Sequence, residues 1–170
     1  DLLQADPSDG GKTWLFTHIV TQEVAYESLS DAARAQLHEQ LARYIEDHGD
    51  LGPDERLELL AHHYGHSGNR AKQRAYLRLA GDRAAARFAA DTARMHYRRL
   101  LALLEPAERP PIFLALGQVL ALKGSWAEAE ALYRELLALA AQQQDHLLIA
   151  RAWYELSNIM SNHGRHEAAL

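Results

Sequence analysis

The sequence predicts an all-α protein, a right-handed helical solenoid preceded by a short β-hairpin. Two observations favour the solenoid. Apolar residues recur at spacings of three and four along most of the 170 residues, as on one face of an α-helix, and one stretch of sequence recurs further along the chain. A third observation, a run of β-branched and aromatic residues near the start, favours strands. Together they predict strands first and helices after them.

The first 17 residues are predicted to form two strands joined by a turn. The strands are the runs "LLQA" and "TWLFT", and the intervening "DPSDGG" is turn-forming sequence throughout. The run "GGKTW" resembles the end of a phosphate-binding loop, but that loop needs a glycine where this chain has Asp6. It also needs a helix after Lys12, where the sequence favours a strand. We therefore predict no nucleotide site and no cofactor here.

Amphipathic helices are predicted after the hairpin. Residues 18–30 and 31–49 carry apolar side chains at helical spacing. The later helices are expected at about 53–66, 70–89, 92–105, 110–123, 126–142 and 147–163, with another beginning near His166.

Several of these helices begin with residues that can satisfy free backbone amides. Asn69 and Asp91 are predicted N-caps, because their short polar side chains precede helical runs. Ser125 and Glu128 have the spacing of a capping box, in which each side chain bonds to the backbone beside the other. These caps set the predicted starts of three helices.

An internal repeat gives the strongest signal in the sequence. Residues 113–129 align with residues 153–169 at a constant offset of 40. In each copy a large residue, Phe113 or Trp153, is followed three positions later by Leu and a small residue, and then by a glycine seven positions on. This spacing is typical of the tetratricopeptide repeat, whose two antiparallel helices cross closely at the small residues. The solenoid is therefore predicted to be tetratricopeptide-like, with Trp126 and Trp153 in its core.

Weaker copies of the repeat precede the strong one. Residues 57–80 form a degenerate third copy, and residues 91–106 resemble a lone second helix. The predicted organisation is a hairpin over 1–17, connecting helices over 18–52, degenerate repeats over 53–109, one repeat over 110–149 and a truncated repeat over 150–170.

The segment after the hairpin resembles a known family. The residues concerned are Phe16 and His18, then "EVAYESL" from Glu23, "LHEQLA" from Leu37 and "LAHHY" from Leu60. They are similar to the segment that follows the nucleotide-binding domain in signal-transducing (STAND/AAA-type) ATPases with tetratricopeptide repeats, as found in bacterial transcription regulators and adenylate-cyclase-associated ATPases. The resemblance implies that the hairpin is the C-terminal wing of a truncated winged-helix domain, and that the parent's phosphate loop lies upstream.

Composition limits the possible function classes. The chain has no cysteine, which excludes disulfides, thiolate catalysis and zinc sites built on sulfur. The longest apolar run, residues 112–122, is shorter than the ~18 residues that a membrane span needs. We therefore expect a soluble, cytoplasmic protein with no membrane partner.

Charge is unevenly distributed along the chain, whose formal net charge is −5. Residues 70–109 carry ten Lys or Arg against four Asp or Glu. Arg70, Arg74 and Arg78 recur every four residues and predict a basic patch along one helix face. A solvated face is the simplest interpretation, and a surface for an acidic partner is the alternative. Nucleic acid is disfavoured, because aromatic residues are not interleaved for base stacking.

No set of catalytic residues has a spacing that stands out, so we predict a non-enzymatic chain without a metal or cofactor. Glu58, His62 and His66 recur every four residues, and on a helix they would share one face within reach of a cation. A polar helix face gives the same spacing and is the interpretation we prefer. His38 and His63 match positions of the resembled family and are expected to pack.

Partner binding is the predicted function. Stacked helix pairs leave a concave groove lined by the first helix of each repeat. With the family resemblance, this implies a regulatory sensor module of a larger signalling ATPase that binds a protein, a peptide or a small inducer. The alternative is a structural arm that mediates self-association of the parent protein. The repeat offsets give these groove candidates: His62, His66, Gln118, Arg151, Tyr154, Asn158 and Asn162.

Overall fold

The computed structural model describes residues 3–5, 14–16, 18–48 and 51–167. No helix in these ranges is both long and apolar enough to span a membrane. The elements in chain order are β1 (Leu3–Ala5), β2 (Trp14–Phe16), α1 (Ile19–Glu27), α2 (Asp31–Asp47), α3 (Pro53–His66), α4 (Arg70–Ala86), α5 (Ala90–Leu101), the short 3-10 helix η2 (Pro106–Glu108), α6 (Pro110–Leu122), α7 (Trp126–Gln142) and α8 (His146–Glu167).

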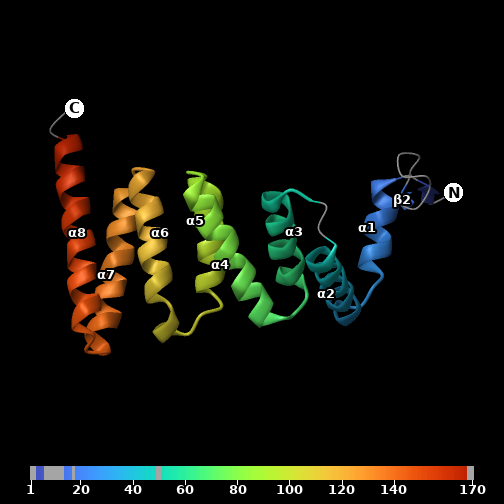
Figure 1. The fold of residues 1–170 in the computed structure, drawn as a ribbon, viewed down its shortest axis with the longest axis horizontal. Coiled ribbons are helices and arrows are strands. Elements are labelled where there is room, and N and C mark those ends of the chain that lie inside the picture. Colours follow the sequence, from blue (N-terminus) through green and yellow to red (C-terminus); the bar gives the residue numbers. More distant parts are fainter. Residues whose placement is uncertain (1–2, 6–13, 17, 49–50, 168–170) are drawn as a thin grey trace.

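The helices stand side by side in chain order, in an elongated row with α1 at one end and α8 at the other (Figure 1). Each helix packs chiefly against its neighbours in the chain, and α6 also contacts α8. Contact between sequence neighbours is the defining property of a solenoid. The helical array predicted from the sequence is therefore confirmed, and α3 and α7 have the predicted bounds.

Two strands of three residues each precede the helices. β1 and β2 pair antiparallel, with Leu3 opposite Phe16 and Ala5 opposite Trp14. The turn predicted between them, which includes the "GGKT" run, lies outside the described residues. The complete hairpin and its assignment to a winged-helix domain therefore stay predictions.

A glycine–tyrosine contact recurs in the array and defines its repeat. A Cβ placed on Gly81 of α4 would lie 2.7 Å from Cε1 of Tyr97 on α5. A Cβ placed on Gly117 of α6 would lie 2.5 Å from Cε1 of Tyr133 on α7. Only glycine lets the backbone approach the ring this closely. The α4–α5 and α6–α7 pairs are thus the same unit, 36 residues apart in the chain.

This pairing corrects the repeat phase predicted for the region before α6. The sequence alignment treated α5 as a lone second helix, whereas α5 is the partner of α4 through the Gly81–Tyr97 contact. The sequence alignment missed this pair because it relied on a glycine in the turn between the two helices of each repeat. In the α4–α5 turn that position is held by Phe88.

Four turns between helices share a residue in the left-handed conformation. Gly68, Phe88, Gly124 and Gln144 have φ values of 76°, 59°, 80° and 54°, and each is the second residue after a helix ends. A left-handed residue here lets the turn's amides bond back to the last carbonyls of the helix. Glycine adopts this conformation freely, whereas a residue with a side chain does so at a cost. Phe88 and Gln144 are therefore the strained positions.

Replacing Phe88 with glycine should stabilise the fold. Phe88→Gly is expected to raise the free energy of unfolding by about 1 kcal/mol, because it removes the left-handed strain. Phe88 is 82% exposed, so little packing is lost with its ring. The reciprocal variant Gly124→Ala should be destabilised by about the same amount. Urea unfolding followed by circular dichroism measures both; a Phe88→Gly chain less stable than wild type would contradict the prediction.

The helix starts only partly follow the predicted caps. Asn69 caps α4 as predicted, and its side chain accepts a hydrogen bond from a backbone amide at 3.2 Å. Asp91 is not an N-cap, because α5 begins one residue earlier and Asp91 pairs with Lys123, the residue just after α6. Ser125 forms no capping box, since the Glu128 carboxylate bonds to arginines of α5 instead. Ion pairs between helices therefore displaced two local caps.

The last helix is longer than predicted, and one of its faces is open. α8 continues through Gly164, where the repeat predicted a turn. Trp153, predicted in the core, is 58% exposed, whereas Phe113 at the equivalent position of α6 is 3% exposed. The difference arises because α6 is flanked by α5 and α7, while α8 packs mainly on α7 within the described residues. Trp126, the other predicted core tryptophan, is half-buried.

Candidate functional site

A concave pocket between α6 and α8 is the principal candidate site, and we call it the α6–α8 groove. It has a volume of about 440 Å³, and side chains of α7 complete its lining. Three predicted groove residues meet here, namely Gln118 from α6 with Asn158 and Asn162 from α8. Apolar side chains, Leu122 and Ile159 among them, separate these amides. The groove therefore offers hydrogen-bonding groups spaced along an apolar surface.

The lining of the groove includes a buried hydroxyl and a buried carboxylate. Tyr133 of α7 is 1% exposed, and its hydroxyl oxygen has no hydrogen-bond partner within the described ranges. Burial raises the pKa of this hydroxyl, and the negative charge of Glu155 adds to the rise. The hydroxyl therefore stays protonated, and its oxygen is packed against Gly117 of α6, out of contact with solvent. Glu155 is 9% exposed and accepts a hydrogen bond from Arg151 at 3.1 Å.

The remaining predicted groove residues do not join this site. Arg151 reaches it only through Glu155, and Tyr154 is 61% exposed and outside the lining. His62 and His66 line a different pocket of about 320 Å³ formed by α3, α4 and α5. The predicted groove candidates therefore line two separate pockets along the helical array.

His62 and His66 instead belong to a cluster of imidazoles between α2 and α3. The ring of His38 lies 5.9 Å from that of His62, 5.2 Å from that of His63 and 5.0 Å from that of His66, measured between centroids. Nδ1 of His38 is 2.9 Å from Nδ1 of His63, and its Nε2 is 2.9 Å from the Tyr26 hydroxyl of α1. His38 and His63 are half-buried, contact each other and lie beside the two exposed histidines.

Burial lowers the pKa of three histidines in this cluster. It is the largest cause for each of His38, His62 and His63, and the positive charge that neighbouring imidazoles would carry adds to it. The pKa of His63 falls to about 4. At pH 7 these rings are therefore neutral, and each has a nitrogen lone pair available for a hydrogen bond or a cation.

Glu58 does not complete a set with His62 and His66, contrary to the spacing argument. Its carboxylate accepts a hydrogen bond from Nε2 of His96 on α5, at 3.0 Å from Oε2. His96 is buried, and its Nδ1 has no partner among the described residues. Glu58 therefore links α3 to α5, and the residue that lies beside His62 and His66 is His38 of α2.

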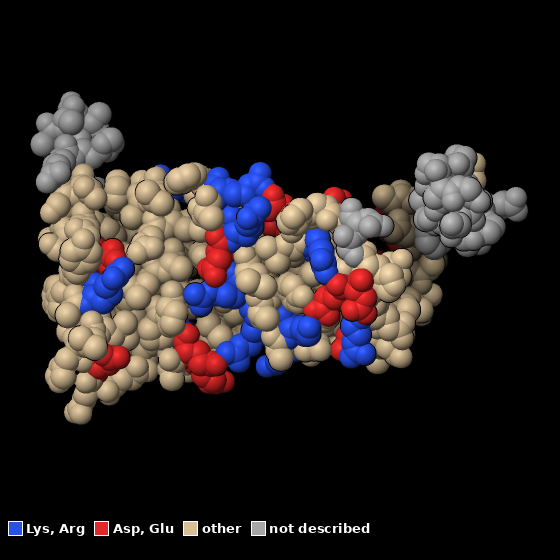
Figure 2. Space-filling model, viewed as in Figure 1, with Lys and Arg blue, Asp and Glu red and all other residues tan. Residues whose placement is uncertain are grey.

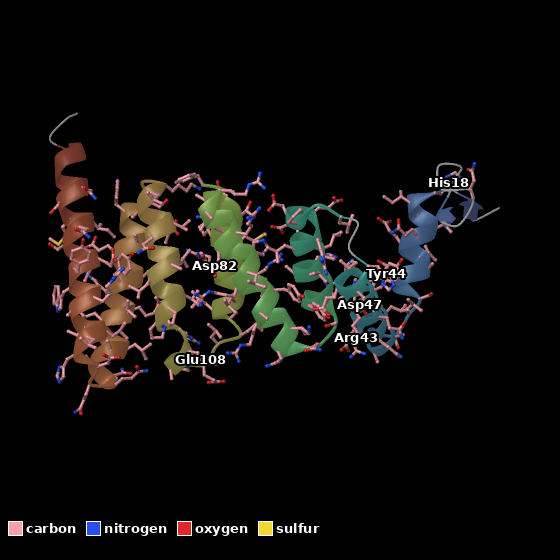
Figure 3. The ribbon with its side chains drawn as sticks, in the orientation of Figure 1. His18, Arg43, Tyr44, Asp47, Asp82 and Glu108 are labelled. Atoms are coloured by element: carbon pink, nitrogen blue, oxygen red, sulfur yellow. The ribbon has the colours of Figure 1, made fainter. Side chains whose placement is uncertain are left out.

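The predicted basic patch is interrupted by acids. Arg74 of α4 pairs with Glu108 of η2, and Arg78 pairs with Asp82 one turn along the same helix at 2.9 Å. Arg70 is exposed at the start of α4. Figure 2 shows blue and red side chains side by side over the middle of the row, and Figure 3 labels the two acids. The surface has alternating charges, so the prediction of a continuous basic patch is corrected.

Sequence reasoning missed Trp126, Tyr133 and Glu155 as groove residues. The repeat pattern assigned Tyr133 and Trp126 to packing, and nothing in it concerned Glu155. A polar signal was nevertheless present. Tyr133 carries a hydroxyl where phenylalanine would fill the same space, and Glu155 places a carboxylate on the buried side of α8. Polar groups at packing positions of a repeat are therefore worth treating as groove candidates.

A comparison with protein-family models finds one relevant match. The model described as a tetratricopeptide repeat matches residues 108–170, which include α6, α7 and α8. The match supports a tetratricopeptide-repeat region over these residues, and such repeats generally mediate protein–protein interaction. They are typically non-catalytic modules. A search of curated proteins found no match.

Proposed function

We propose that the α6–α8 groove binds an extended peptide segment of a protein partner. Amide side chains both donate and accept hydrogen bonds, which matches the alternating N–H and C=O groups of an extended backbone. The apolar lining suits a peptide side chain. The observation that carries the proposal is the convergence of Gln118, Asn158 and Asn162 on one pocket inside the matched repeat region.

The groove amides should determine peptide affinity. Peptides selected from a random library against the chain serve as probes, and fluorescence anisotropy measures their Kd. Asn158→Ala combined with Asn162→Ala should weaken binding at least about tenfold, since each lost hydrogen bond contributes about 1 kcal/mol. Gln142→Ala, exposed at the end of α7, is the matched control. Selected peptides that bind the double variant as tightly as wild type would contradict a groove site.

Tyr133→Phe tests whether the buried hydroxyl belongs to the packing or to the ligand surface. The hydroxyl oxygen has no partner within the described part of the chain, so its removal should leave the free energy of unfolding unchanged or slightly higher. Peptide affinity should stay within about twofold of wild type, because a ligand in the groove does not reach an oxygen that solvent does not reach. A loss of about tenfold or more in affinity would show that the groove opens to this hydroxyl when a peptide binds.

We further infer that the chain is a regulatory module of a larger signalling ATPase of the STAND/AAA type, acting in bacterial cytoplasmic signal transduction. The support is the family resemblance together with an open apolar face on α1, where Ile19, Val20 and Val24 are 71%, 64% and 61% exposed. Such a face suits contact with a preceding winged-helix domain. The coding sequence upstream of Asp1 tests this inference: a phosphate-binding loop is expected there, and its absence from the full-length protein would refute the ATPase context.

A small inducer is the second ligand class that a groove of about 440 Å³ admits.

Self-association is the competing role, favoured by the open face of α8, where Leu147, Trp153 and Met160 are 86%, 58% and 65% exposed. Light scattering of the chain with and without further repeats appended after Leu170 distinguishes the roles. Dimers that persist once the α8 face is covered use another surface and favour a structural arm, whereas dimers lost on covering were held by the α8 face itself; a chain that is monomeric in both forms favours the peptide-binding module.

A further inference from the structure

The histidine cluster has the geometry of a cation site, and it includes His38, which the spacing of His62 and His66 did not indicate. His38, His62 and His66 each offer one ring nitrogen, and these three atoms lie within 4.8 Å of one another. Bonds of about 2.0–2.1 Å from Zn²⁺ to imidazole nitrogens hold the nitrogens of a tetrahedral site about 3.3 Å apart. Small side-chain rotations at an exposed site cover that difference. His62 and His66 already share one face of α3, one turn apart.

The hydrogen bond of His66 leaves one of its nitrogens free for a cation. Nδ1 of His66 lies 2.8 Å from the carbonyl oxygen of His62. A carbonyl only accepts, so Nδ1 carries the hydrogen and Nε2 carries the lone pair. A bond from the second ring nitrogen to a backbone carbonyl is the usual way in which a metal-binding histidine is fixed in its tautomer and orientation.

His38 is oriented toward the same point from the opposite helix. Its Nε2 contacts the Tyr26 hydroxyl, and its Nδ1 faces α3 at the distance of a hydrogen bond from His63. When Nε2–H donates to the Tyr26 oxygen, Nδ1 carries the lone pair and lies against His63 of α3, the helix that also carries His62 and His66. His63 supplies the proton to that lone pair until a cation replaces it. The cluster thus has two orienting groups, one on α1 and one on α3.

We propose that His38, His62 and His66 bind a borderline divalent cation of the Zn²⁺ class and so clamp α2 to α3. Three imidazoles without a thiolate or carboxylate select Zn²⁺ or Ni²⁺ over Mg²⁺ or Ca²⁺, which prefer oxygen ligands. His62 and His66 are exposed, so the cation enters from solvent and a water or a partner side chain completes its coordination. The bound cation joins the connecting helices to the helical array independently of the α6–α8 groove.

Titration of the intact chain with ZnCl₂ alone, in a buffer that does not bind metals, tests the site. Isothermal titration calorimetry should show one strong site per chain, and the midpoint of thermal unfolding should rise by roughly 5 °C at a hundredfold excess over Kd. His66→Gln keeps a polar side chain at an exposed helical position and should weaken Zn²⁺ binding at least tenfold. His38→Ala should do the same.

Two matched variants distinguish this site from other histidines. His48→Ala removes an exposed histidine at the end of α2, and Glu58→Gln removes the acid that shares the four-residue spacing of His62 and His66; both should bind Zn²⁺ as wild type does. Circular dichroism without metal establishes that each variant is folded. The proposal is overturned if wild type shows neither heat nor a thermal shift, or if His38→Ala and His66→Gln retain wild-type affinity.

Discussion

Gly117→Ala is expected to lower the free energy of unfolding by about 2 to 3 kcal/mol, because the added methyl group overpacks the crossing of α6 and α7. Its Cβ would lie 2.5 Å from Cε1 and 2.6 Å from the hydroxyl oxygen of Tyr133. Tyr133 is 1% exposed, so its ring has no open space into which it can move. Alanine favours the helix over glycine by about 1 kcal/mol at most. The clash with Tyr133 is larger, so the net change in the free energy of unfolding is a loss.

Gly65→Ala is the matched control for this effect. Gly65 is also helical, but a Cβ there meets nothing within 4 Å, so the substitution should be neutral or stabilise by up to about 1 kcal/mol. Tyr133→Leu combined with Gly117→Ala should lose less than the sum of the two single changes, because the smaller side chain makes room for the methyl group. Urea unfolding of the four chains measures this coupling; additive losses would mean that the two residues do not touch.

The helices could be predicted from the sequence because their signals are local. α3 and α7 have the predicted bounds, since apolar spacing of three and four reports one buried helix face wherever that face lies. Two features were missed because they depend on neighbouring helices. The α4–α5 turn was not recognised because Phe88 stands where a glycine was expected. The exposure of Trp153 depends on which helices pack beside α8. The repeat pattern contains neither piece of information.

The candidate sites also divide into those that the repeat pattern predicts and those that depend on contacts between helices. Gln118, Asn158 and Asn162 were among the predicted groove candidates and line one pocket, because the repeat offset relates α6 to α8 directly. His38 could not be joined to His62, since they are 24 residues apart on helices that no repeat relates. The basic patch failed for a related reason. Charges counted along one helix do not include acids supplied by η2.

Glu46 is the second position where a single substitution should have a large effect. This residue of α2 accepts hydrogen bonds from the hydroxyl of Tyr64 on α3 at 2.7 Å, from Lys72 on α4 at 2.7 Å and from the hydroxyl of Tyr76 on α4. The Tyr64 and Tyr76 rings stack with their centroids 5.2 Å apart. One carboxylate therefore connects three successive helices, and its side chain is only 20% exposed.

The pKa of Glu46 reports the strength of these contacts. Burial alone would raise the pKa, but the hydrogen bonds from Lys72, Tyr76 and Tyr64 outweigh burial and lower it to about 2. The same burial and the carboxylate raise the pKa of Tyr76 to about 12. The unfolded chain takes up the proton near pH 4.5 and the folded chain only near pH 2. Glu46 therefore stabilises the fold fully above about pH 4.5, and this contribution is lost as the pH falls toward 2.

Glu46→Gln is expected to lower the free energy of unfolding at pH 7 by about 2 to 3 kcal/mol, since it leaves Lys72 unpaired and weakens two buried hydrogen bonds. The loss should shrink between pH 4.5 and 2, because wild type loses the same carboxylate there by protonation. Glu130→Gln is the control, because it breaks only one pair with the exposed Arg134 and should cost less than about 0.5 kcal/mol. Urea unfolding at pH 7, 4 and 3 measures these differences. A Glu46→Gln deficit that stays constant from pH 7 to 3 would show that shape and packing, rather than the charge of Glu46, hold α2, α3 and α4 together.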